Sequence, residues 1–166
     1  MRLSRRVTLL AGAAALAGCA RETKFRAYDG PEVTHVLVNK GARRMFLLNE
    51  DRLLEHYRVD LGFAPKGHKQ FEGDGKTPEG RYVIDRRNPD SAYHLSLGIS
   101  YPNQADIAYA RAHGRSPGGD IFIHGEATTL GLIKPDWTAG CISVKNREIE
   151  DIYAMVRNGT PITITA

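Results

Sequence analysis

Two side chains in this sequence could together carry out nucleophilic acyl transfer. Cys141 lies in the segment DWTAGCISV, and His124 lies near the end of the apolar segment IFIHG that precedes it. A cysteine thiolate attacks carbonyl carbons, and an imidazole can remove the thiol proton or stabilise the thiolate as an ion pair. Gly140 allows a sharp turn before the cysteine, so the backbone N–H groups of Gly140 and Cys141 could hold the oxyanion of an acyl-transfer intermediate.

Each of these residues also has a purely structural interpretation. A free cysteine is often a small buried apolar side chain, and a single histidine at a strand end is more often structural than catalytic. Two observations favour chemistry. The only other cysteine is Cys19, close to the N-terminus, so Cys141 has no disulfide partner in the folded part of the chain. Of the six histidines, only His124 combines an apolar strand with a glycine directly after it. Trp137 is expected to pack rather than to contact a ligand.

The N-terminus has the pattern of an export signal. Three arginines among the first six residues precede an apolar run that is shorter than the roughly 20 residues needed to span a bilayer as a helix. The run ends in LAGC, which resembles the lipobox of bacterial lipoproteins, with Cys19 as the lipidated residue. Arg5-Arg6 also resembles a twin-arginine signal. A plain secretory signal with an incidental Cys19 is the alternative.

The domain organisation follows from this leader. We expect a signal peptide over residues 1–18, a polar tether over 19–31 that begins at the lipidated Cys19, and one catalytic domain over 32–166. The protein would then sit on the periplasmic side of the cell envelope, anchored through its lipid to the inner or the outer membrane. The sequence does not decide between these two membranes.

The charge of the chain gives no case for nucleic-acid binding. The leader holds three of the 23 basic residues and none of the 19 acidic ones, which leaves 20 basic and 19 acidic residues and a net charge near +1. Nucleic-acid binding usually needs a clustered basic surface, and none is evident. The spacing of the histidines suggests no metal site, and no cofactor is implied.

The elements that would position Cys141 and His124 are mostly strands. Short β-branched and apolar segments between turn signals predict strands, and Ile149, Ile152, Tyr153 and Val156 fall on one face of a helix that Asn146 could cap and Gly159 could end. The expected strands are 33–40, 43–49, 52–62, 81–85, 92–102, 121–125, 140–144 and 161–165, with a helix near 103–113, a second helix after 146 and ordered loops over 63–80 and 111–120.

Several segments resemble the L,D-transpeptidase (YkuD) family of bacterial cell-wall enzymes. His124-Gly125 is similar to the family's His-Gly, and the residues from Thr138 to Cys141 match its Ser/Thr-His-Gly-Cys at three of four positions. Upstream, GDGKTPEG is similar to a second segment of the same family. The resemblance extends over about 33–165. The chain departs from the pattern at Ala139, where most members have histidine, and this leaves the outcome of the reaction open.

The resemblance implies a mainly β fold, a sandwich or barrel with one or two helices and a site in a cleft. Cys141 would attack the carbonyl between diaminopimelate and D-alanine of a peptidoglycan stem peptide, with His124 as the base and backbone N–H groups of Ala139 and Gly140 at the oxyanion. Transfer of the acyl group to an amine would give a 3–3 crosslink. The alternatives are a hydrolase of the same chemistry, which trims stems or releases wall-linked lipoprotein, and a non-catalytic wall-binding lipoprotein.

Four further residues are candidates for substrate binding. Gly125 and Thr138 flank the two catalytic candidates, and Arg111 and Arg115 lie on a glycine-rich segment before the His124 strand. The arginines could attract an acidic stem peptide. They could equally be solvated loop charges.

Overall fold

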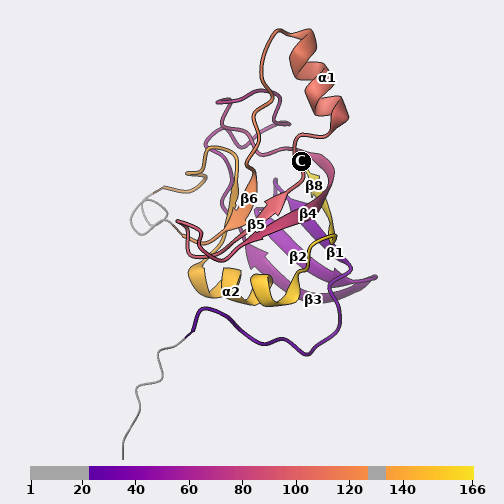
Figure 1. Cartoon of the computed structure of the whole chain (residues 1–166), viewed down its shortest axis with the longest axis vertical. Coiled ribbons are helices and arrows are strands. Elements are labelled where there is room, and N and C mark those ends of the chain that lie inside the picture. The colour runs from indigo at the N-terminus through magenta and orange to yellow at the C-terminus, as the bar shows by residue number, and fades with distance from the viewer. Residues whose placement is uncertain (1–22, 127–133) are drawn as a thin grey trace, which may run out of the picture.

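The computed structural model describes residues 23–126 and 134–166, which form eight strands and two helices (Figure 1). The expected leader, Cys19 and most of the segment between His124 and Trp137 lie outside these residues. In chain order the elements are β1 (His35–Asn39), β2 (Arg44–Asn49), β3 (Arg52–Arg58), β4 (Gly80–Asn88), β5 (Ser96–Ile99), α1 (Gln104–Ala112), β6 (Phe122–His124), β7 (Ile142–Ser143), α2 (Asn146–Met155) and β8 (Pro161–Thr165).

All eight strands belong to one curled sheet with the order β3-β2-β1-β8-β4-β5-β6-β7. The last strand, β8, inserts between β1 and β4, parallel to β1 and antiparallel to β4. The two ends of this order approach each other, because Asp60, just after β3, exchanges backbone hydrogen bonds of 2.9 and 2.8 Å with Ser143 of β7. The expected mainly β fold, a sandwich or barrel with one or two helices, is confirmed: the sheet curls into a half-barrel and the described residues include two helices.

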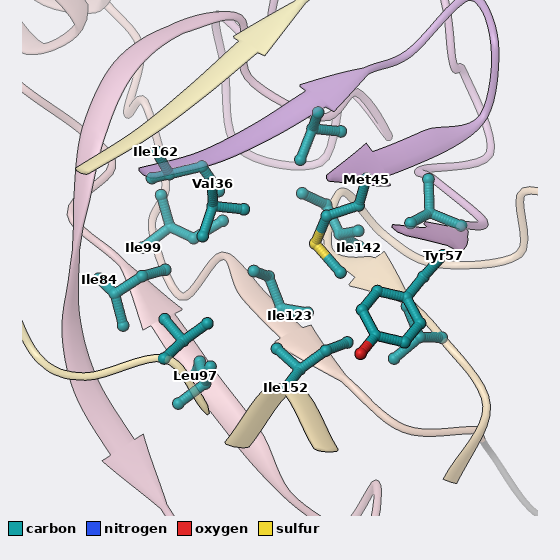
Figure 2. Close-up of a cluster of buried hydrophobic side chains, with 14 of the residues drawn as sticks. Val36, Met45, Tyr57, Ile84, Leu97, Ile99, Ile123, Ile142, Ile152 and Ile162 are labelled. Carbon is teal, nitrogen blue, oxygen red and sulfur yellow. The ribbon is translucent and has the colours of Figure 1, made fainter. Parts of the chain in front are cut away.

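The concave side of the sheet encloses the hydrophobic core, and α2 packs into it (Figure 2). Ile149 and Ile152 of α2 are fully buried, as the periodicity of that segment predicted. Burying a side chain of this size stabilises the fold by about 1.5–3 kcal/mol. The labelled core residues in Figure 2 are Val36, Met45, Tyr57, Ile84, Leu97, Ile99, Ile123, Ile142, Ile152 and Ile162.

Two expected element boundaries near the site differ from the structure. The strand expected over 92–102 begins only at Ser96, because His94 has a positive φ of 72° and forms a turn with Tyr93. Asn146 is not the cap of α2: Lys145 holds that position, and the Asn146 side chain accepts a hydrogen bond from the backbone of Glu126 at 3.0 Å. Asn146 therefore ties the helix to the chain just after β6.

The second helix also ends earlier than expected. It stops at Met155, with Val156 as its C-cap, and the turn that contains Gly159 follows before β8. The strands predicted over 52–62, 121–125 and 140–144 are shorter in the structure, and the residues beyond their ends form the loops around the site. Among the residues that the structure describes, no helix is long and apolar enough to cross a membrane.

Candidate active site

Pairing between β6 and β7 brings His124 and Cys141 to the same face of the sheet. The two strands are parallel, with Ile123 opposite Ile142 and His124 opposite Ser143. Side chains at i and i+2 share a face, so Cys141, two residues before Ser143, faces the same side as His124. An offset of two residues is roughly 6.6 Å along a strand, and neighbouring strands lie about 4.8 Å apart. Two side chains that extend from such positions can hold a reacting group between them.

The imidazole of His124 is held in one tautomer. Its Nδ1 lies 2.7 Å from the carbonyl oxygen of Gly125. Because a carbonyl only accepts, Nδ1 carries the proton and Nε2 is left with its lone pair. Burial lowers the pKa of His124, and the hydrogen bond to Gly125 only partly offsets this effect. The ring is therefore neutral near pH 7 and can act as a base through Nε2.

Two aromatic side chains fix the plane of this imidazole. The ring of Tyr93 stacks on His124 with centroids 4.5 Å apart, and Trp137 meets it edge-on at 5.6 Å. Contacts of this geometry add about 0.5–1.5 kcal/mol beyond their buried area. Trp137 packs, as expected, and its packing partner is the histidine of the site. The sequence analysis missed Tyr93, whose position depends on the turn before β5.

The thiol of Cys141 is half-buried and lies 3.5 Å from the carbonyl oxygen of Asp120, to which it donates. Burial raises the pKa of Cys141; a backbone hydrogen bond with Phe122 and the charge of Lys69 act in the opposite direction without cancelling it. The resting site thus holds a neutral thiol and a neutral imidazole. The sequence left open whether His124 removes the thiol proton of Cys141 or forms a permanent ion pair with its thiolate. The neutral resting state favours proton removal.

The residues from 138 to 141 form a tight turn with a defined set of backbone donors. The Thr138 hydroxyl donates to the carbonyl oxygen of Cys141 at 2.7 Å and accepts from the N–H of Gly140 at 3.2 Å. Thr138 is buried, so its hydroxyl shapes the turn and does not face a ligand. The N–H of Gly140 is also occupied, contrary to its expected role. The N–H groups of Ala139 and Cys141 make no hydrogen bond within the described residues and remain the oxyanion candidates.

Gly140 is required by this turn. Its φ is +136°, and a Cβ placed on it would lie 2.7 Å from the carbonyl oxygen of Lys76. A side chain would therefore collide with the loop that passes over the turn. The sequence prediction that a glycine is needed directly before the cysteine has a physical basis in this close approach.

Gly125 orients His124. Its carbonyl oxygen accepts from the imidazole and, at 3.3 Å, from the Ser143 hydroxyl, while its N–H donates to the carbonyl oxygen of Tyr93 at 3.0 Å. A Cβ at this position would lie 2.5 Å from the side chain of Asn146. The N–H and carbonyl groups of Gly125 thus form hydrogen bonds within the protein. The structure gives them this role in place of the expected contact with substrate.

A cavity of about 240 Å³ opens at the thiol. It is lined by Lys69, Glu72, Gly73, Gly118, Gly119, Asp120, Ile121, Ala139 and Cys141. Arg111 and Arg115, the predicted substrate contacts, do not belong to this lining. Arg111 is exposed in the last turn of α1, and the Arg115 guanidinium lies 4.0 Å from the ring centroid of Phe71. The cation at the cavity is Lys69, which the sequence analysis had not singled out.

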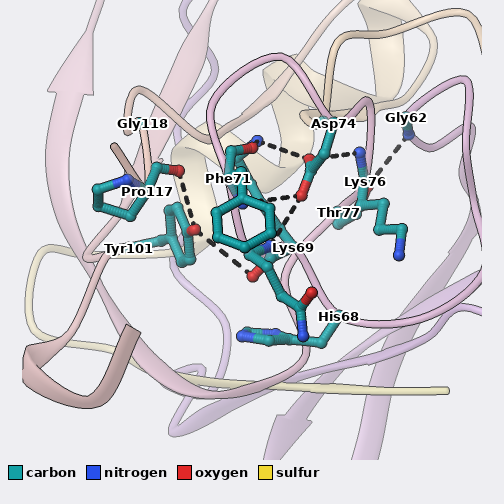
Figure 3. Close-up of polar contacts among 12 residues, drawn as sticks. Gly62, His68, Lys69, Phe71, Asp74, Lys76, Thr77, Tyr101, Pro117 and Gly118 are labelled. Atoms are coloured by element: carbon teal, nitrogen blue, oxygen red, sulfur yellow. Dashed lines mark hydrogen bonds and ion pairs between the residues drawn. The ribbon is translucent and has the colours of Figure 1, made fainter. Parts of the chain in front are cut away.

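The loop between β3 and β4 forms one wall of this cavity and is rigidly organised (Figure 3). The carboxylate of Asp74 accepts from the backbone N–H groups of Gln70, Phe71 and Lys76 at 2.8, 3.0 and 3.0 Å and from the Lys69 ammonium at 2.9 Å. Partial burial acts to raise the pKa of Asp74, but these bonds outweigh it and the pKa is lowered. Asp74 is therefore ionised and holds the loop in shape.

Lys40 fixes the same loop from the sheet. Its buried ammonium donates to the carbonyl oxygens of Gly67 and Thr77 at 2.6 and 2.9 Å and pairs with Glu79 at 2.8 Å. The Thr77 hydroxyl in turn accepts from the N–H of Gly62 at 3.1 Å. The loop that carries GDGKTPEG thus has two buried lysines as its supports. Within residues 23–126 and 134–166, no group of three or more histidine, cysteine, aspartate or glutamate side chains could hold a metal ion.

Comparison with known proteins agrees with this geometry. The profile of the L,D-transpeptidase catalytic domain, YkuD, matches residues 33–164. The chain is 35% identical over 107 residues to Escherichia coli YafK, which is named as an L,D-transpeptidase, and the match covers 63% of this chain and 38% of YafK.

Solved structures are also similar. Pgp2 of Campylobacter jejuni, a helical cell shape determining protein, superposes with a TM-score of 0.63 and 27% identity over 82% of this chain and 49% of Pgp2. Bd1075 of Bdellovibrio bacteriovorus superposes with a TM-score of 0.57 and 26% identity, over 85% of this chain and 50% of Bd1075. An L,D-transpeptidase of Mycobacterium smegmatis, at 15% identity and a TM-score of 0.55, shares the fold.

The chain therefore spans about two fifths of YafK and half of Pgp2. The family profile covers every described strand except the last residue of β8. Sequence, fold and site geometry agree, and this chain belongs to the L,D-transpeptidase (YkuD) catalytic-domain family.

Proposed function

We propose that the protein is a cysteine acyltransferase that acts on peptidoglycan stem peptides, with Cys141 as the nucleophile and His124 as the base. The observation that carries this proposal is the β6–β7 register, which sets both side chains on one face of the sheet, together with the cavity that opens at the Cys141 thiol. Membership of the L,D-transpeptidase family supports the substrate: the carbonyl between diaminopimelate and D-alanine.

In the first half-reaction, Nε2 of His124 removes the proton of the Cys141 thiol as sulfur bonds to the carbonyl carbon. The N–H groups of Ala139 and Cys141 would hold the oxyanion, and one donor of this kind contributes about 3 kcal/mol to stabilising the transition state. The C–N bond to D-alanine then breaks. The leaving amine takes the proton from His124, and the diaminopimelate acyl group remains on sulfur as a thioester.

In the second half-reaction an amine attacks the thioester. His124 accepts a proton from the amine, the S–C bond breaks, and the proton returns to the thiolate of Cys141. If the amine is the side-chain amine of diaminopimelate in a second stem, the product is a 3–3 crosslink. The neutral resting pair fits this cycle, because His124 gives up in each half-reaction the one proton that it has taken, and the second half-reaction restores the neutral thiol.

Hydrolysis is the second candidate. Ala139 lines the cavity where most family members carry histidine, so its methyl group leaves the thioester accessible to water from that side. Water would then replace the amine and release a shortened stem. Incubation of the soluble domain with wall sacculi separates the two outcomes, because transfer yields new 3–3 dimers and hydrolysis yields shortened stems or freed protein.

We also propose that the domain is held in the cell envelope by lipid on Cys19, after removal of residues 1–18. The basis is the LAGC tetrapeptide behind a short apolar run. Labelling of whole cells with a fatty-acid probe, with Cys19→Ala as the control, tests this part separately from the chemistry.

The direct test of the acyl-enzyme is intact-mass analysis after mixing the protein with a stem tetrapeptide that ends in diaminopimelate–D-alanine. We expect a mass increase equal to the peptide minus D-alanine, located on Cys141 by peptide mapping. Cys141→Ser should show no thioester while keeping the same melting temperature. A wild-type protein that gives neither the adduct nor any released D-alanine would refute the proposed activity.

A further inference from the structure

The cavity beside Cys141 carries charges of both signs. Its lining includes one ammonium, that of Lys69, and two carboxylates, those of Glu72 and Asp120. A group with a single negative charge would meet one cation and two anions there. A group that carries an ammonium and a carboxylate together can satisfy both signs, and charged hydrogen bonds of this kind are the strong ones.

Lys69 is built into the cavity wall. Its side chain is nine-tenths buried or more, and its ammonium donates to the carbonyl oxygen of Phe71 and to Asp74, each at 2.9 Å. An ammonium has three N–H donors, and the third contacts no acceptor within the residues described. The Lys69 charge also acts on the Cys141 thiol, lowering its pKa against the effect of burial. The cation is thus fixed, close to the nucleophile, and retains one donor.

The two acids of the lining, Glu72 and Asp120, are both exposed. Glu72 is held by a backbone hydrogen bond to Ser116 of 2.9 Å, and its Cβ would lie 3.2 Å from a side chain placed on Gly118, so the two loops meet at this point. The Asp120 side chain is 88% exposed and lies 3.7 Å from the Arg86 guanidinium, which partly balances it. Glu72 is therefore the acid best placed to receive an ammonium.

We propose that Lys69 and Glu72 form a subsite for a zwitterionic amino-acid end, with the carboxylate at Lys69 and the ammonium at Glu72. The proposal rests on the proposed function and names the part of the donor that is recognised: the side chain of diaminopimelate, which ends in a carbon bearing both groups. The terminal carboxylate of D-alanine is a lone anion and fits the mixed charges less well. Lys69 and Glu72 are specificity-determining residues, separate from the His124–Cys141 pair.

The test measures binding, so it does not depend on turnover. In a Cys141→Ala background, calorimetry compares four stem tetrapeptides: the natural one, one with the diaminopimelate side-chain carboxylate as a carboxamide, one with lysine in place of diaminopimelate, and one with D-alaninamide at the end. We expect the carboxamide and lysine peptides to bind about tenfold or more weakly, and the D-alaninamide peptide to bind nearly as well as the natural one.

Variants then assign the effect to side chains. Lys69→Met keeps the apolar stem and should weaken the natural peptide about tenfold while removing the difference between it and the carboxamide peptide. Lys69→Arg keeps the charge if methionine proves too disruptive, and should retain part of the discrimination. Glu72→Gln should remove the preference for a free over an acetylated side-chain amine.

Lys40→Met is the matched control, because Lys40 is a second buried lysine that supports the same loop but does not line the cavity. It should leave the discrimination between peptides intact. Equal loss of discrimination in Lys40→Met and Lys69→Met would overturn the proposal in favour of a loop-support role, as would a Lys69→Met variant that still separates the two peptides. Discriminating binding without any acyl-enzyme in the wild type would leave the subsite standing and remove the proposed activity.

Discussion

Tyr93 stacks its ring on the imidazole of His124, with the two centroids 4.5 Å apart and the planes 27° from parallel. The backbone of the same tyrosine accepts from the N–H of Gly125, whose own carbonyl oxygen holds Nδ1 of His124. One turn, just before β5, therefore supports both the plane and the tautomer of the proposed base. Tyr93 is a positioning residue, since it acts through His124.

Loss of the Tyr93 ring should slow acylation without weakening substrate binding. Tyr93→Ala removes the stacking contact, worth about 0.5–1.5 kcal/mol, and allows the imidazole to rotate, so we expect acylation to fall about tenfold in kcat with little change in KM. Tyr93→Phe keeps the ring and is the matched control. Single-turnover mass spectrometry gives the rates. A Tyr93→Phe variant as slow as Tyr93→Ala would show that the hydroxyl, and not the stacked ring, matters.

Removal of the base itself should have a larger effect. His124→Gln preserves much of the buried volume but cannot take the thiol proton, so acylation should drop by about 10²–10⁴-fold. The melting temperature should change far less than the rate. Rapid mixing with a stem tetrapeptide, followed by quenching and intact-mass analysis, measures the acylation rate. A rate within threefold of wild type would exclude His124 as the base.

The pH dependence of thiol reactivity should follow the neutral resting state. Burial raises the pKa of Cys141, so the rate of alkylation by iodoacetamide should still be rising at and above pH 9. Burial lowers the pKa of His124, so acylation by the stem peptide should stay high at pH 7 and fall only below the usual range of histidine, as the imidazole becomes protonated. Fast alkylation that is already constant at pH 6–7 would contradict this and indicate a preformed thiolate–imidazolium pair.

Gly140 should not tolerate a side chain. Gly140→Ala forces a positive φ of 136° on alanine and brings its Cβ to 2.7 Å from the carbonyl oxygen of Lys76, so we expect destabilisation of about 2 kcal/mol or more and loss of acylation. Gly80→Ala is the matched control: its φ of +128° is close to that of Gly140, but the nearest atoms to the added Cβ, in the Tyr82 side chain, are 3.6 Å away. Urea unfolding of both variants separates the steric clash from backbone strain.

Short-range patterns in the sequence predicted α2 and the strand ends at the site. The 3.6-residue period around Ile149 and Ile152 predicted the buried face of α2, and the His-Gly and Gly-Cys segments marked the strand ends at the site. Tyr93 was missed because it reaches His124 only through the β5–β6 pairing and a turn at His94 inside a segment that alternates like a strand.

The burial of two lysines, Lys40 and Lys69, could not be predicted from the sequence for a different reason. Nothing in the sequence around Lys40 and Lys69 distinguishes them from ordinary lysines, which are mostly solvated. Each is buried because loop carbonyls and a carboxylate, brought together by the chain reversal between β3 and β4, surround its ammonium. Such a cage is made by residues up to 39 positions apart, and no local period encodes it. Arg111 and Arg115 were chosen for their charge, but Arg111 is exposed on α1 and Arg115 packs on Phe71, so neither lines the cavity.

The segment that precedes β1 should detach from α2 in acid. Arg26 donates to Glu150 at 2.7 and 3.0 Å, and His94 lies 2.8 Å from the other oxygen of the same carboxylate. Partial burial acts to raise the pKa of Glu150, but the hydrogen bonds from Arg26 and His94 outweigh it and the pKa is lowered. A carboxylate with a lowered pKa stabilises the folded form above its unfolded pKa, and this contribution disappears as the pH falls through the folded value.

We therefore expect the NMR signals of residues 23–32 to move to random-coil positions as the pH falls below the usual pKa range of glutamate, while those of β1 and β8 keep their folded positions. Arg26→Gln should give the acid behaviour already at pH 7, because Glu150 loses its main partner. Asp29→Asn is the control, since no ion pair of Asp29 occurs among the described residues. Because Glu150 also contacts His94, next to Tyr93, detachment should lower the acylation rate of Arg26→Gln at pH 7 as well. Random-coil signals for this segment with no change in acylation would separate it from the site.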